Sequence, residues 1–255
     1  MAQFILPLLP RRFQRYYEPF LGSGALFFAA QPGRAFLSDQ NRDLILTYRQ
    51  VRDNPQAVIE ELGKLKNTEK DYYAVRSAAP KSEPERAARF IYLSTLSFNG
   101  IHRVNLRGVF NVPYGHKTHL RPNAPERILA VSEVLSKTTI ECQDFEVAVA
   151  SAREGDVVYL DPPYTTAHTN NGFVKYNAKI FTWDDQQRLA VLAHKLARRG
   201  CAVLVSNADH HSIRALYKGF RVLEIDRHSV IAASRKFRRR ITECVFYNGH
   251  ARNVD

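Results

Sequence analysis

Four consecutive residues, Asp161-Pro162-Pro163-Tyr164, carry groups that could hold a planar amine. They follow the apolar run 157–160, which is typical of a buried strand that ends at an acid. Asp161 would then lie at the carboxyl end of a strand, where open α/β sheets bind their ligands. The prolines fix φ and lack N–H donors, so the turn is stiff and its carbonyls can accept hydrogen bonds. Tyr164 adds a flat aromatic face. The alternative is a Pro-Pro turn that only ends a strand.

A second set of candidate ligand groups lies nearer the N-terminus. Gly22 and Gly24 occupy a predicted strand-to-helix turn, where glycine lets a backbone approach a ligand and helix N–H groups point at it. Asp39 ends the predicted strand 34–39, at the place where nucleotide-binding α/β units hold a ribose. Two alternatives stay open, because a Gly-x-Gly pair is also typical of an ordinary tight turn and Asp39 could cap the next helix.

The segment 98–123 is rich in basic side chains, Asn and Gly, has aromatic residues between them, and contains no acid. Such donors can meet phosphates and base edges, and the candidates are Arg103, Arg107, His116, Lys117, His119 and Arg121. The formal net charge of +12 also favours a polyanionic partner, of which nucleic acid is the commonest. A solvated basic hairpin is the alternative. The basic segment 227–240 is either a second phosphate contact or a solvated charge run.

The bulk composition excludes several classes of protein. With 255 residues, of which 45% are hydrophobic, the chain can bury a sizeable core, and no apolar run is long enough to span a membrane. The three cysteines are far apart and match neither a disulfide framework nor a zinc site. We therefore expect a cytoplasmic protein that binds no metal and no membrane.

An alternation of strands and helices positions these motifs. Strands are predicted at 34–39, 138–142, 157–160, 201–205, 220–225 and 241–247, and Thr182 with Asp185 is typical of a helix cap. The alternation stops over 53–136, where helices are predicted at 55–65 and 85–96. We expect an α/β catalytic domain of residues 1–52 and 137–255, with residues 53–136 as a second, inserted domain.

Taken in order, four motifs resemble the Dam class of DNA adenine-N6 methyltransferases. The matching segments are Glu18 to Gly24, Asp39 to Leu44, Phe98 to Gly100 through Pro113 to Gly115, and Asp161 to Tyr164. The resemblance runs from about residue 5 to 247. It implies a Rossmann-like, S-adenosylmethionine-dependent methyltransferase sheet with an inserted, mostly helical target-recognition domain that carries a β-hairpin.

The resemblance also implies a role for residues in each motif. S-adenosyl-L-methionine would be bound by Glu18, Phe20, Gly22, Gly24, Asp39, Asp144, Phe145 and Asp161. The catalytic residues would be Asp161, Pro162 and Tyr164, with the acid and the Pro162 carbonyl on the adenine amine and Tyr164 stacked on the flipped base. Asn99, Ile101, Arg103 and Pro113 match the segment that reads or braces the DNA target. The basic composition of the same segment adds Arg107, His116 and Lys117 as expected DNA contacts.

The implied partner is double-stranded DNA, with methylation of adenine in Gly-Ala-Thr-Cys or a related site. We expect a monomer that works with a cognate restriction or defence system. The family usually opens with a Trp-x-Gly-Gly-Lys segment that contacts the cofactor. The printed sequence holds one tryptophan, Trp183, and no such segment, so either the opening is truncated or part of the cofactor pocket is lacking. A disabled DNA-binding relative and a cytosine-N4, RNA or protein-glutamine methyltransferase are the alternatives.

Overall fold

The computed structural model describes residues 1–105, 108–165, 181–228 and 240–249, and the chain divides into two compact units. The first unit contains residues 1–40 and 137–255, and the second contains residues 41–136. Helix α3 (Arg42–Asp53) therefore belongs to the second unit, whereas the sequence pattern placed the boundary after residue 52.

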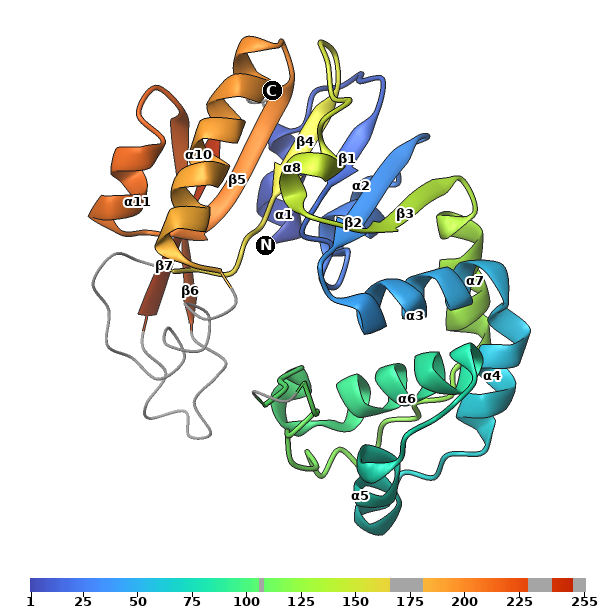
Figure 1. The fold of residues 1–255 in the computed structure, drawn as a ribbon. Coiled ribbons are helices and arrows are strands. Elements are labelled where there is room, and N and C mark those ends of the chain that lie inside the picture. The colour runs from blue at the N-terminus through green and yellow to red at the C-terminus, as the bar shows by residue number, and fades with distance from the viewer. Residues whose placement is uncertain (106–107, 166–180, 229–239, 250–255) are drawn as a thin grey trace. The chain divides into compact units, whose positions relative to one another are not determined.

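A seven-stranded sheet forms the centre of the first unit, in the order β3-β2-β1-β4-β5-β7-β6 (Figure 1). The strands are β1 (Tyr16–Glu18), β2 (Ala35–Asp39), β3 (Thr138–Cys142), β4 (Val157–Leu160), β5 (Ala202–Ala208), β6 (Arg221–His228) and β7 (Arg240–Tyr247). Strands β1 to β5 are parallel, and β7 runs antiparallel between β5 and β6. The strand order reverses between β1 and β4, which makes their carboxyl ends a topological switch point. This sheet and its helices confirm the predicted α/β class.

Helices cover both faces of this sheet (Figure 1). They are α1 (Ala2–Ile5), η1 (Leu6–Leu8), α2 (Ala25–Ala30), α8 (Phe145–Ala148), α10 (Trp183–Arg198) and α11 (His211–Leu216). Tyr17 and Val158 pack with Leu189 of α10 in the main buried cluster. Because successive strand residues point to opposite faces, Tyr16 and Tyr159 face the other side of the sheet. The two faces of β4 thus have different neighbours just before Asp161.

Helix α10 begins at the predicted cap. The Thr182 hydroxyl accepts from the Asp185 backbone N–H at 3.1 Å, and the Asp185 carboxylate accepts from the Thr182 N–H at 2.9 Å. This reciprocal capping box satisfies two N–H groups that the first turn of a helix cannot pair internally. The cap therefore fixes where α10 starts, which matters because the first turn of α10 reaches the site.

The amino ends of β1 and β4 are joined by an ion pair. Arg15 Nη2 lies 2.6 Å from Asp156 Oδ2, and the carboxylate is completely buried. Asp156 also accepts from the Arg153 backbone N–H at 2.9 Å, so several donors compensate the buried charge. The pair fastens the two central strands together at the end opposite the switch point.

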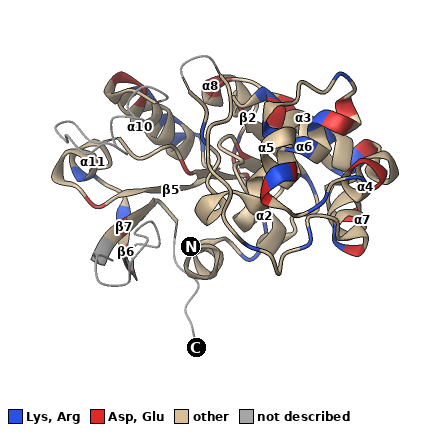
Figure 2. Ribbon diagram, turned by 90° about the horizontal axis from the view of Figure 1, so that it is seen from below, with Lys and Arg blue, Asp and Glu red and all other residues tan. Residues whose placement is uncertain are grey.

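The second unit is mainly helical. Besides α3 it contains α4 (Pro55–Gly63), α5 (Glu69–Ser77), α6 (Glu83–Leu96), η2 (Phe98–Gly100) and α7 (Pro125–Leu135). Tyr72, Tyr92 and Leu62 are buried between these helices. Figure 2 shows basic positions interspersed with acidic ones along the helices of this unit. None of the described helices, in either unit, is long and apolar enough to cross a membrane.

The expected β-hairpin differs from the structure within the described residues. There, antiparallel pairing in the segment after α6 consists of two isolated bridges, Ser97 with Tyr114 and Val104 with Phe110. Pro113 has no N–H to extend a ladder, and its carbonyl accepts from the Phe98 N–H at 2.9 Å. Around the second bridge the Asn105 N–H donates to the Val109 carbonyl at 2.8 Å and the Asn111 N–H to the Arg103 carbonyl at 3.1 Å, so pairing in the described residues is limited to short bridges.

Candidate active site

A cavity of about 480 Å³ opens at the carboxyl ends of β1, β2 and β4. Its lining residues are Pro19, Phe20, Gly22, Asp39, Gln40, Phe145, Asp161, Pro162, Pro163, Tyr164, Phe181 and Glu243. Seven of the residues singled out in the sequence therefore line one pocket, although they come from separate segments. Glu18, Gly24 and Asp144 are not in this lining. Glu18 is buried at the end of β1, Gly24 precedes α2, and Asp144 caps α8.

The turn after β1 is tied to the end of β2. The Gly22 N–H donates to Asp39 Oδ2 at 3.1 Å, and the Leu21 N–H donates to the Ser38 carbonyl at 2.9 Å. Gly22 and Gly24 have positive φ values of 46° and 63°, which glycine adopts without a Cβ clash. Open space lies around the position of a Cβ at Gly22, so a ligand can approach the backbone there.

Asp39 does not cap the next helix. Asn41 does so, because its side-chain oxygen accepts from the backbone N–H groups of Asp43 and Leu44 at 3.1 and 3.2 Å. The carboxylate of Asp39 lies at the lip of the cavity instead. The helix-cap alternative for Asp39 is therefore wrong, and the acid can contact a ligand.

The Asp-Pro-Pro-Tyr turn follows β4 directly. The Tyr164 hydroxyl lies 3.5 Å from Asp161 Oδ1, at the long end of a hydrogen bond. Tyr159 lies two residues before Asp161 and so points to the same face of the sheet. Its hydroxyl is hydrogen bonded to the Ser206 hydroxyl of β5 at 2.9 Å. Burial, followed by the nearby Asp161 charge, raises the pKa of Tyr159, so this phenol stays neutral. A neutral, anchored tyrosine therefore lies beneath the acid.

Glu18, at the end of β1, is buried, with 2% of its surface exposed. Burial raises the pKa of Glu18 to about 8, the Tyr16 hydroxyl at 2.8 Å opposes that rise, and the charge of Asp161 adds to it. Glu18 is thus mostly protonated at neutral pH, because two nearby carboxylates in a poorly solvated place do not both ionise readily. Of these two neighbouring acids, Glu18 is buried and mostly neutral, and Asp161 lines the cavity.

Three aromatic rings form one wall of the cavity. Phe20 stacks on Phe145 with ring centroids 5.4 Å apart, and Phe181 meets Phe20 edge-on at 5.6 Å. Phe145 and Phe181 are buried, whereas Phe20 is half-buried. Phe181 was not singled out in the sequence, where it is one apolar residue at the end of a polar stretch. The wall provides aromatic surface on which a planar ring of a ligand could stack.

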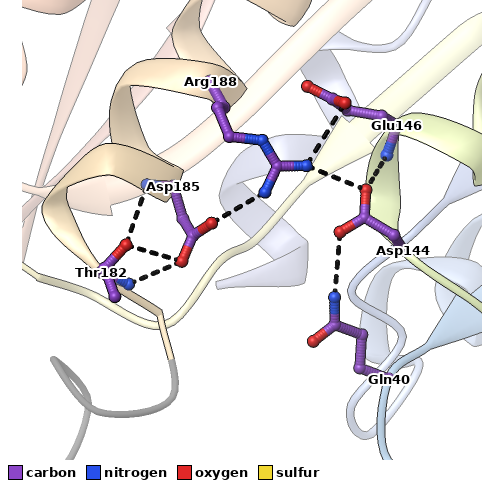
Figure 3. Close-up of polar contacts among 6 residues, drawn as sticks. All are labelled: Gln40, Asp144, Glu146, Thr182, Asp185 and Arg188. Atoms are coloured by element: carbon purple, nitrogen blue, oxygen red, sulfur yellow. Dashed lines mark hydrogen bonds and ion pairs between the residues drawn. The ribbon is translucent and has the colours of Figure 1, made fainter.

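Arg188 of α10 lies among the carboxylates of Asp185, Asp144 and Glu146, beside the aromatic wall (Figure 3 shows the polar contacts). Its guanidinium lies 4.9 Å from the Phe145 ring centroid and bonds to Asp185 at 2.8 Å and to Asp144 and Glu146 at 3.3 Å. Asp144 itself caps α8 by accepting from the Glu146 N–H at 2.9 Å. The Gln40 side chain also donates to Asp144, at 3.0 Å. Asp144 therefore supports the cavity by fixing α8, with Phe145 as the residue that reaches the ligand space.

The residues expected to contact DNA lie in the second unit, which the structure places in and beside η2. Asn99 is exposed with φ of 53°, and the half-buried Ile101 accepts a hydrogen bond from Ser97 through its carbonyl at 3.0 Å. Arg103 is exposed, and its Nε donates to Asn111 at 2.9 Å. These side chains are held by short-range contacts within the unit.

The remaining expected DNA contacts follow Arg103. Pro113 and His116 are exposed, and His116 has φ of 53° with its ring edge-on to Tyr114 at 5.0 Å. Lys117 is half-buried, donates to the Thr95 carbonyl at 3.1 Å, and has its pKa lowered by burial. Arg107 lies outside the described residues.

No trio of His, Cys, Asp or Glu side chains within the described residues is arranged to hold a metal ion. The described site combines the Asp161 turn, the Gly22 turn, the carboxylate of Asp39 and the aromatic wall at the switch point of the sheet. Such a pocket suits a nucleoside-sized ligand with a reacting amine beside Asp161.

Comparison with known proteins agrees with this reading. A family model described as D12 class N6 adenine-specific DNA methyltransferase matches residues 1–231. A type II methyltransferase of Lactococcus lactis subsp. cremoris is 37% identical over 251 residues, covering 94% of this chain and 88% of the relative. DNA adenine methylases of Vibrio cholerae and Escherichia coli K12 are 34% and 31% identical. Both matches cover 89% of this chain, and they cover 84% and 83% of those proteins. The chain belongs to the D12 class of N6 adenine-specific DNA methyltransferases and is an adenine-specific DNA methyltransferase.

Proposed function

We propose that the cavity at the switch point binds S-adenosylmethionine and receives an adenine flipped out of duplex DNA, which is methylated at N6 beside Asp161. The family implies a methyl donor of this type and a DNA substrate. The single observation that carries the proposal is the convergence of Gly22, Asp39 and Asp161 on one cavity with an aromatic wall.

The residues present fit the proposed donor. Asp39 would accept hydrogen bonds from the ribose hydroxyls, as acids at the end of the second strand do in nucleotide-binding α/β folds. Phe20 and Phe145 would hold the adenine ring of the donor by stacking. The open space at Gly22 leaves room for close backbone approach. When bound, the donor supplies a methyl group on a positively charged sulfur.

Asp161 and the Pro162 carbonyl would prepare the target amine. The lone pair of N6 is delocalised into the adenine ring, so N6 is a poor nucleophile. If each oxygen accepts one N–H, the nitrogen becomes more tetrahedral and its lone pair localises toward the methyl carbon. The N–C bond would form as the donor's C–S bond breaks, and Asp161 would accept the proton that N6 loses along their hydrogen bond. This is catalysis by positioning and electrostatics.

Glu18 and Tyr164 would assist in different ways. Because Glu18 is mostly neutral at neutral pH, it adds little competing charge near Asp161 and the sulfonium. A base in duplex DNA cannot reach such a cavity, so the target must leave the stack, and Tyr164 would replace the stacking that it loses. Asp161 would then contact both the amine and the donor.

The second unit would recognise the DNA. Its exposed residues Asn99, Arg103 and His116 offer donors for base edges and phosphates. We infer a target of Gly-Ala-Thr-Cys or a related sequence, from the resemblance of this segment to the Dam class. We also infer a monomer in the cytoplasm with a cognate restriction or defence system; the type II methyltransferase of Lactococcus lactis, to which this chain is similar, supports the last inference.

Calorimetric titration with S-adenosylmethionine tests the donor site. Phe20→Ala should weaken binding roughly two- to twelve-fold, because an aromatic pair contributes ~0.5–1.5 kcal/mol beyond the area it buries. Phe220→Ala is a matched control, since Phe220 is also half-buried but packs against His194 and Tyr217, outside the cavity lining. Equal effects of the two substitutions, or none at Phe20, would contradict the proposed site.

A further inference from the structure

We propose that Gln186 and Asn207 form a buried amide relay that positions the Asp-Pro-Pro-Tyr turn for methyl transfer. The relay starts at the carboxyl end of β5, crosses the first turn of α10 and ends on a carbonyl of the turn. This inference rests on the proposed function, in which that turn holds the target adenine. Neither residue lines the cavity, so both act as positioning residues.

The contacts form a continuous chain. Asn207 Nδ2 donates to Gln186 Oε1 at 3.0 Å, and Gln186 Nε2 donates to the Pro163 carbonyl at 3.1 Å. Asn207 Oδ1 accepts from the Ala208 backbone N–H at 2.9 Å. Each amide is therefore oriented by a partner at both ends, and flipping Gln186 would set its oxygen against the Pro163 oxygen.

Both side chains are fully buried, with 0% of their surface exposed. A buried amide without partners is costly, so two amides in this place need a specific pairing. Leu189, one turn further along α10, lies in the buried hydrophobic cluster, so the pair borders apolar core. An apolar core could fill the same space more simply, which indicates that the carbonyl contact is the purpose of the pair.

The contact controls the part of the turn that meets the base. The Pro163 carbonyl and the Tyr164 N–H belong to one planar peptide unit, so holding the carbonyl fixes the plane from which the Tyr164 side chain projects. Within the described part of the chain, no hydrogen bond reaches the Pro162 carbonyl. Gln186 thus engages the second proline carbonyl and leaves the first available to accept from the adenine amine.

The anchor of the relay is rigid. Gln186 belongs to the first turn of α10, where its N–H donates to the Thr182 carbonyl at 3.1 Å beside the capping box. Asn207 belongs to β5, which is paired on both edges, with β4 and with β7. The relay therefore transmits the position of two fixed elements to a turn that lies between them.

Single-turnover methylation at saturating donor and DNA tests the relay. Gln186→Met keeps the side-chain length but removes the N–H donor, and we expect the rate constant per active site to fall roughly ten- to hundred-fold. Misplacement of reacting groups by about 1 Å has an effect of this size. Dissociation constants for S-adenosylmethionine and DNA should change by less than about two-fold by the same reasoning, because the cavity walls are untouched. Leu189→Met, a buried substitution one turn away, should leave the rate unchanged.

Gln186→Glu adds a readout that simple loss of packing would not produce. The protonated acid can donate to the Pro163 carbonyl and still accept from Asn207, whereas the carboxylate would repel that carbonyl. The rate of this variant relative to the wild type should therefore rise as the pH is lowered. If Gln186→Met does not fold, the pH dependence of the Gln186→Glu rate tests the relay by itself.

Three results would overturn the relay: a Gln186→Met rate within about two-fold of the wild type, an equal loss in Leu189→Met, or a Gln186→Glu ratio that does not vary with pH. Asp161→Ala distinguishes this outcome from failure of the proposed function. If Asp161→Ala abolishes methyl transfer while Gln186→Met is fully active, only the relay is wrong. If Asp161→Ala is active, the catalytic assignment of the turn is wrong as well.

Discussion

Glu18 makes the stability of the first unit depend on pH in a predictable direction. Its pKa is about 8 in the folded chain against an ordinary value of 4.5, so the folded state holds a proton that the unfolded state releases between these values. The free energy of unfolding should therefore be highest near pH 4.5, fall as the pH rises to about 8, and level off above that. The difference of about 3.5 pKa units corresponds to a fall of at most about 5 kcal/mol.

Glu18→Gln removes the titration and keeps the hydrogen bond, because the amide oxygen can accept from the Tyr16 hydroxyl as the acid does. The variant should lose most of this decline, and so should gain stability over the wild type steadily as the pH rises. Glu141→Gln, at an exposed acid of the same sheet, should keep the wild-type dependence.

Denaturant unfolding followed by tryptophan fluorescence measures the effect, because the only tryptophan, Trp183, packs against the core of the first unit. Midpoints at several pH values from about 5 to about 9 give the free energies of unfolding. A decline that persists in Glu18→Gln would refute the reasoning, since another group would then carry the titration. A flat profile in the wild type would refute it too.

Three further predictions concern other parts of the chain. Asp156→Ala should lower the free energy of unfolding by about 3–5 kcal/mol, because it leaves the Arg15 guanidinium without its buried partner, and an unchanged denaturation midpoint would argue against this. Arg188→Leu removes a cation–π contact with Phe145 worth ~0.5–1 kcal/mol, so the dissociation constant for S-adenosylmethionine should rise roughly two- to five-fold. The single-turnover rate at saturating donor should not fall. A lower rate with unchanged donor binding would contradict this prediction. Arg103→Ala should reduce discrimination between site-containing and mismatched duplexes by about 1–3 kcal/mol, and Arg127→Ala, at an exposed arginine on α7, should not; methylation rates on the two duplexes give the comparison.

The sequence allowed the ligand-bearing turns to be predicted because each is a local motif. Asp161 and Asp39 each follow an apolar run, and parallel strands bring the ends of such runs to one edge of a sheet. Gly22 was recognisable for the same reason, since a glycine turn between a strand and a helix carries its own signal. These predictions needed no knowledge of which strands are neighbours.

The supporting residues could not be predicted in this way, because their roles arise from packing between distant segments. Nothing local to Gln186 shows that it meets Pro163, and Glu18 gives no sign in the sequence of its burial beside Asp161. Helix α5 is a different case. Its cap is a local signal, since the Thr68 hydroxyl accepts from the Asp71 N–H, three residues further on, at 3.1 Å.

The central claim is that adenine is methylated at N6 in the switch-point cavity, with Asp161 as the acid that holds the target amine. The most direct test incubates the wild type and Asp161→Ala with tritiated S-adenosylmethionine and duplexes that contain or lack Gly-Ala-Thr-Cys, then identifies the labelled base. Asp184→Ala, an acid at the start of α10 outside the cavity lining, is the control. We expect label on N6 of adenine for the wild type and the control, only in the site-containing duplex, and none for a folded Asp161→Ala. Methyl transfer by Asp161→Ala, or label on a base other than adenine, would contradict the account.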